Sequence, residues 1–89
     1  MTLVWKEKTY QIEINWSVLI IFEKIAGHEL DLLSISDIIL LFYSALTLAM
    51  YKNHEDQPDY DEFFSFVGKN QPILLQFINF VETSLKDKE

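Results

Sequence analysis

The longest apolar stretch of the chain, Ile38 to Tyr51, contains no charged residue, no Gly and no Pro. Its apolar side chains fall at nearly every angle of a helical projection, and such a helix must be covered on several sides. A membrane span needs about 20 mainly apolar residues, whereas Asp37 and Lys52 bound this stretch at its two ends. The pattern therefore predicts a buried central helix over 35–52.

Residues 10–16 alternate between apolar and polar side chains with a period of two, which is typical of a half-buried strand. We predict strands over 2–5 and 9–15, joined by a short polar turn at Lys6-Glu7-Lys8. An isolated hairpin is marginal, so its apolar face should pack on the helices. The side chains expected on that face are Tyr10, Ile12, Ile14 and Trp16.

Three shorter segments carry signals for the start or end of a helix. Asn15 can cap the first, and Gly27 can end it. Asp59 can cap the second, and Pro72 suits the first position of the third. With the central helix, these signals predict a mainly α (α+β) fold, in which a short N-terminal β-hairpin (1–16) precedes about four packed helices. The three shorter helices are predicted over 16–27, 60–67 and 72–86, within a single domain of residues 1–89.

The connection before the central helix is rich in leucine, and we expect Leu30, Leu32 and Leu33 to pack it against the core. Ser34 and Asp37 have the spacing of a capping box, with Asp in place of Glu. The positions expected to face the core are Val18, Ile21, Phe22 and Ile25 in the first helix and Leu74, Phe77, Ile78, Val81 and Leu85 in the last.

The chain has more apolar residues than these faces use. Of its 89 residues, 49% are hydrophobic, yet a domain of this size buries only about 60% of its unfolded surface. Surplus apolar side chains are either ordinary core residues or a contact face for another chain. We predict the second, with self-association as one use of the face. The residues assigned to partner binding are Leu19, Ile20, Phe66, Ile73 and Phe80.

Charge limits the kinds of partner. The net charge is −7, from fourteen acidic residues and seven lysines, and there is no arginine. Nucleic-acid binding needs a basic face, so we expect no nucleic-acid partner, and an attraction to basic protein surfaces. The first residues lack the apolar run of a signal peptide. We therefore expect a cytoplasmic protein without a membrane role.

No pattern in the sequence indicates catalysis or a bound cofactor. The chain has no cysteine, and its serines lack a GxSxG setting. The acidic stretch 53–62 lacks the Gly of an EF-hand loop and contains Pro58 instead. His28-Glu29 would need a second histidine at position 32 to form HExxH, but that residue is Leu32. We predict a non-enzymatic protein with no catalytic, cofactor-binding or metal-binding residues.

Several segments together resemble a known family, the small tail assembly chaperones of long-tailed (siphovirus-like) bacteriophages and prophages. After the N-terminal strand pair, NWSVLIIFEKIAGHEL (15–30) resembles their first helix, with Phe22-Glu23 and Gly27 in the expected places. SISDIILLFYSAL (34–46) resembles their second helix, and DYDEFFSFV (59–67) resembles the start of the next.

The resemblance implies a cytoplasmic assembly factor of the bacterial host rather than a part of the finished particle. It implies binding to the tape-measure protein and help in placing the tail-tube protein around it. It also implies self-association, and a longer frameshifted form is common in the family. The alternative is a small acidic adaptor or regulatory subunit of a bacterial protein complex.

Overall fold

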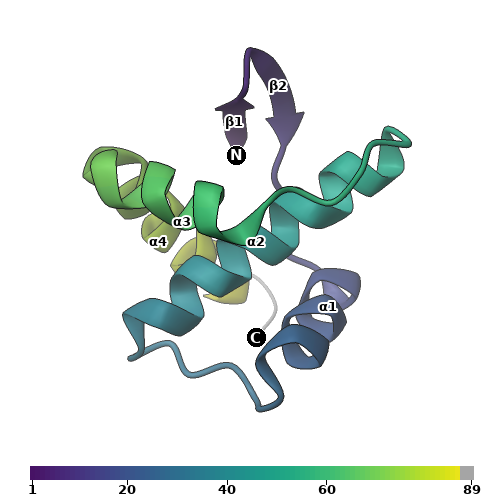
Figure 1. Cartoon of the computed structure of the whole chain (residues 1–89). Coiled ribbons are helices and arrows are strands. Elements are labelled where there is room, and N and C mark those ends of the chain that lie inside the picture. The colour runs from purple at the N-terminus through teal and green to yellow at the C-terminus, as the bar shows by residue number, and fades with distance from the viewer. Residues whose placement is uncertain (87–89) are drawn as a thin grey trace.

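The predicted mainly α fold is confirmed. The computed structural model describes the backbone of residues 1–86 and the side chains of residues 1–84. A two-stranded antiparallel hairpin precedes four helices (Figure 1). In chain order the elements are β1 (Thr2–Trp5), β2 (Lys8–Gln11), α1 (Trp16–Ala26), α2 (Ile35–Lys52), α3 (Tyr60–Lys69) and α4 (Gln71–Lys86).

The hairpin covers one side of α2. In its register Leu3 lies opposite Tyr10, and Trp5 lies opposite Lys8. Lys6 and Glu7 form the turn with φ angles of 49° and 70°; a type I′ turn requires positive φ at both central positions. The buried side chains of the two strands and the following segment are Leu3, Trp5, Tyr10, Ile12 and Ile14.

The second strand is shorter than the alternating pattern predicted. β2 ends at Gln11, although Ile12 still exchanges two backbone hydrogen bonds with Met1. The expectation that Trp16 is buried is wrong, because 76% of this residue is exposed. Trp16 is the first residue of α1, where the helical period replaces the period of two and turns the side chain outwards.

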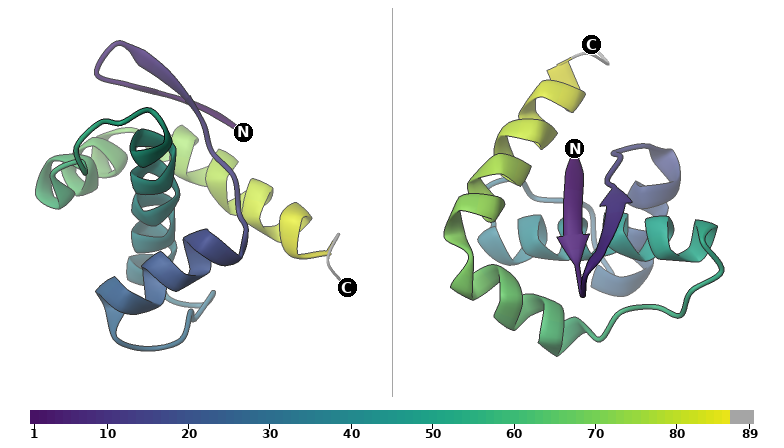
Figure 2. Two further views of the ribbon diagram at one scale, coloured as in Figure 1. Left: turned by 90° about the vertical axis from the view of Figure 1, so that its right-hand side faces the viewer. Right: turned by 90° about the horizontal axis from the view of Figure 1, so that it is seen from above.

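Helix α2 is the centre of the core, as its apolar pattern predicted. Every residue from Asp37 to Leu46 except Leu40 is buried. The Phe42 ring stacks on Phe77 of α4, with ring centroids 4.2 Å apart, and meets Phe63 of α3 edge-on. In Figure 2, α1 lies on one side of α2, while α3 and α4 follow each other around the other side. By length and composition α2 could also cross a membrane, but half of it is buried inside the fold.

The predicted caps of α1 form. The Asn15 side chain accepts a hydrogen bond from the Val18 N–H at 3.0 Å. Gly27 has a φ of 76°, and its N–H donates to the Glu23 carbonyl at 2.8 Å. This left-handed conformation ends the helix and is unstrained only for glycine.

Some predicted core positions are wrong. Among the described elements, α1 packs against α2 alone and therefore buries a narrow stripe centred on Val18 and Phe22. Ile25 lies outside this stripe and is 44% exposed. Leu33, expected to pack the loop down, is 95% exposed, and Leu32 is 42% exposed. The side chain of Leu85 lies outside the described residues. Helix α3 continues through Gly68 to Lys69 rather than ending at residue 67.

Candidate interaction groove

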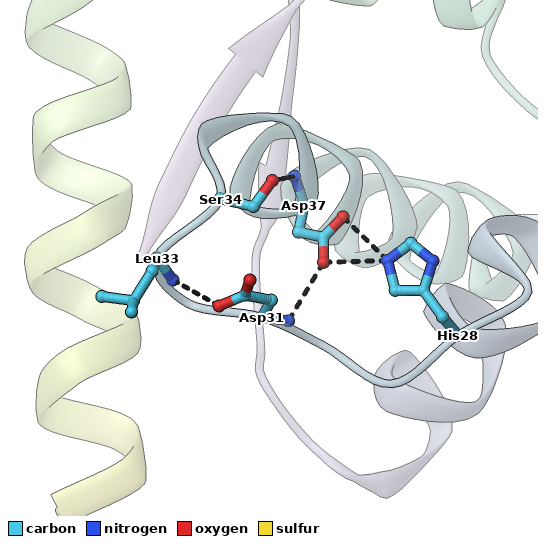
Figure 3. Close-up of polar contacts among 5 residues, drawn as sticks. All are labelled: His28, Asp31, Leu33, Ser34 and Asp37. Atoms are coloured by element: carbon cyan, nitrogen blue, oxygen red, sulfur yellow. Dashed lines mark hydrogen bonds and ion pairs between the residues drawn. The ribbon is translucent and has the colours of Figure 1, made fainter.

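A cluster of polar contacts fixes the loop between α1 and α2 (Figure 3). Nε2 of His28 lies 3.0 Å from both carboxylate oxygens of Asp37, and the Asp31 N–H donates to the same carboxylate at 3.0 Å. The Asp31 carboxylate in turn accepts the Leu33 N–H at 2.9 Å. The loop is therefore held by the side chain of a buried acid and, of its three leucines, by Leu30, which packs against the core as predicted.

The Asp37 side chain has a different role from the one predicted. The Ser34 hydroxyl accepts the Asp37 N–H at 3.3 Å, as in a capping box. The carboxylate does not complete the box; it turns to His28 and Asp31. Burial acts to raise the pKa of the Asp37 carboxyl, but the hydrogen bonds from His28 and Asp31 and the nearby His28 charge outweigh it and lower the pKa.

This loop borders an apolar groove between the N-terminal half of α2 and helix α4. The groove consists of two adjoining hollows, of about 400 Å³ and about 180 Å³, which share Ile38 and Ile78. Among the side chains of residues 1–84, the polar ones that line it are Gln71 and Glu82. The apolar lining is formed by Leu32, Leu33, Ile35, Ile38, Ile39, Val67, Gly68, Leu74, Leu75, Ile78 and Val81.

Large apolar side chains stand exposed along both edges of the groove. Ile35 on α2 is 64% exposed and Leu75 on α4 is 61% exposed. Figure 3 shows Leu33, the most exposed of them, pointing from the loop towards α4. Apolar patches of this kind commonly mark binding sites for other proteins. We therefore take the α2–α4 groove as the candidate functional site.

Glycine at position 68 keeps one end of the groove open. Gly68 lies in α3 and lines the larger hollow, and a Cβ placed there would meet no atom within 4 Å. A Cβ at this position therefore clashes with no neighbouring atom. Position 68 is a suitable place to block the groove.

The five residues assigned to partner binding from the sequence do not form one patch. Ile20 is 52% exposed on α1, whereas the other four are half-buried against the core. Phe66 packs edge-on against Trp5, at 5.3 Å between ring centroids. Among the described elements, the backbone of α1 approaches that of α2 alone, so Leu19 and Ile20 lie apart from the residues on α3 and α4. Their role in binding stays a prediction.

Sequence reasoning missed the exposed residues of the groove. Leu75 lies outside the predicted core stripe of α4, and Leu33 was assigned to the interior. The signal available was the Leu74-Leu75 pair, since adjacent residues on one helix cannot both point to a narrow core. Whether two helices leave a gap between their apolar faces depends on how the helices pack. The hydrophobic pattern does not specify this packing.

Two other hollows are more polar than the groove. One, of about 250 Å³, lies between β2 and α2 beside the ion pair of Glu13 and Lys52. The other lies beside the hairpin turn, where the Lys6 ammonium is 2.7 Å from the Glu62 carboxylate. Within residues 1–84 no three His, Asp or Glu side chains are grouped to hold a metal ion.

No family model, curated protein or solved structure matches this chain.

Proposed function

We propose that this chain is a non-enzymatic protein-binding module whose α2–α4 groove covers an apolar segment of a partner. The open groove edged by Leu33, Ile35 and Leu75 carries this proposal. Such side chains are costly to leave in water, at about 25 cal/mol per Å² of apolar surface. A partner that covers them gains this free energy on binding.

Within this class, a tail assembly chaperone that binds a tape-measure protein is the function we favour. The segments 15–30, 34–46 and 59–67 that resemble the family include α1, most of α2 and the start of α3. A small acidic domain with an exposed apolar groove suits a cytoplasmic factor that keeps a long apolar partner soluble. The tail-tube protein and further copies of the chain are the other partners that the resemblance implies.

The test is co-expression of the chain with a tape-measure protein of a long-tailed bacteriophage, followed by affinity purification. The groove variant Ile35→Glu/Leu75→Glu should lose roughly tenfold or more in captured partner, because it places charges where apolar side chains are buried on binding. Both positions are exposed, so the fold should be retained.

A matched control is the variant Trp16→Glu/Tyr51→Glu, which also replaces two exposed apolar residues, away from the groove. It should capture as much tape-measure protein as the wild type. If the wild type captures none, the chaperone function is refuted. Stoichiometric binding of an identified folded host protein through the groove would support the adaptor function instead.

A further inference from the structure

We propose that the occupant of the α2–α4 groove is a short amphipathic helix with basic side chains at the end that meets Glu82. This inference rests on the proposed function, because it takes the groove as the binding site and names the chemistry of its partner. Three features support it: the length of the groove, the nature of its walls, and its charge.

The groove has the length of a short helix. Its α4 wall runs from Gln71, which lines the larger hollow, to Glu82, which lines the smaller one. Eleven helical steps at 1.5 Å per residue make this wall about 16 Å long, or about three turns. A partner helix of three turns presents apolar residues at i, i+3 or i+4, and i+7 along such a wall.

The walls favour a helix over an extended strand. A strand gains most of its affinity from hydrogen bonds to an exposed sheet edge. Here the walls are mainly helices, whose interior backbone groups are already paired, and the lining given by residues 1–84 is apolar except for Gln71 and Glu82. An occupant must therefore satisfy its own backbone groups, as a helix does.

The acidic residues at one end of the groove favour a partner with basic side chains there. Glu82 is an exposed acid that lines the smaller hollow. Asp31, whose carboxylate holds the Leu33 N–H, adds a second acid at this end. No lysine of the described side chains lines either hollow. A second copy of this chain, itself at −7, would place acid against acid.

The experiment uses two synthetic peptides of 14 residues with one leucine stripe, labelled for fluorescence anisotropy. One carries two lysines at one end, and the other carries two glutamates in their place. The wild-type chain should bind the lysine peptide more tightly. Glu82→Lys should weaken that binding about fivefold, the effect of about 1 kcal/mol, and should tighten binding of the glutamate peptide.

Glu23→Lys is the matched control, because it makes the same change of charge at an exposed position on α1. It should leave the preference between the peptides unchanged. Gly68→Leu adds a large apolar side chain to the lining of the larger hollow, at a position where a Cβ meets no atom within 4 Å. It should abolish binding of both peptides while the thermal unfolding curve stays cooperative.

Equal affinity for the two peptides, or equal effects of Glu82→Lys and Glu23→Lys, would overturn the inference. So would a dimer in light scattering that Glu82→Lys strengthens and Gly68→Leu dissociates, because the groove would then hold a second copy. The two proposals fail separately. Peptide selectivity without capture of the tape-measure protein refutes the chaperone function only, whereas capture without selectivity refutes only this inference.

Discussion

Asp37 is the residue on which the loop beside the groove depends. Its carboxylate forms a hydrogen bond with Nε2 of His28 and accepts the Asp31 N–H. These hydrogen bonds lower the pKa of the Asp37 carboxyl despite its burial. A pKa below the unfolded value of about 3.9 means that the ionised carboxylate stabilises the fold above about pH 4. That contribution is lost as the pH falls through the folded pKa.

We therefore expect Asp37→Asn to lower the melting temperature at neutral pH. The difference from the wild type should shrink as the pH falls below about 4, because the unfolded carboxyl then binds a proton and the folded one follows at lower pH. Thermal unfolding followed by circular dichroism measures this, with Glu29→Gln as an exposed control. A difference that stays constant over this range would mean that the charge of Asp37 is unimportant.

The two glycines of the chain should respond to alanine in opposite directions. Gly27 has a φ of 76°, where an alanine costs roughly 1–2 kcal/mol. Gly68 lies within α3 with space around its Cβ position, so alanine there should add about 0.5–1 kcal/mol. Urea unfolding of the two variants tests this. Destabilisation by Gly68→Ala would show that the position is more crowded than its surroundings indicate.

At the scale of elements, the hairpin turn is held in a conformation that its residues do not favour. Lys6 and Glu7 both have positive φ angles, and neither is Gly, Asn or Asp. Lys6 is held by the Glu62 carboxylate at 2.7 Å and lies over the Trp5 ring. These contacts tie the turn to α3 and to the face that the hairpin buries.

Replacing Glu7 by glycine should relieve the turn while keeping the contacts of Lys6. The expected gain is about 1 kcal/mol, or about 4–8 °C in melting temperature for a domain of this size. Glu23→Gly, in the interior of α1, should instead cost about 1 kcal/mol. A melting temperature of Glu7→Gly at or below the wild-type value would contradict this account of the turn.

The elements could be predicted from local signals, but their exposed faces could not. β1 and α2 have the predicted bounds, whereas the clear alternation over 9–15 predicted a longer second strand than β2, which ends at Gln11. Leu33 was misplaced because a leucine in a loop is a core residue in most small domains, whereas hydrogen bonds to Asp37 and Asp31 fix this loop. Hydrophobic pattern alone contains no information about such a polar cluster.

At the scale of the whole molecule, the core has an aromatic centre and one open edge. Phe42, Phe63 and Phe77 pack ring on ring where α2, α3 and α4 meet. Beside this packed centre, α4 and the first turns of α2 stay far enough apart to leave the groove. The fold is thus closely packed around its aromatic centre and open along one edge, as the proposed binding of a partner helix requires.

The most direct test of the groove is hydroxyl-radical footprinting of the chain alone and in complex with its captured partner. Modification of Leu33, Ile35 and Leu75 should fall in the complex, because binding buries these exposed side chains. Trp16 and Tyr51, exposed elsewhere, should react as before. Protection of Trp16 or Tyr51, with the three groove residues unchanged, would place the binding site elsewhere and contradict the account.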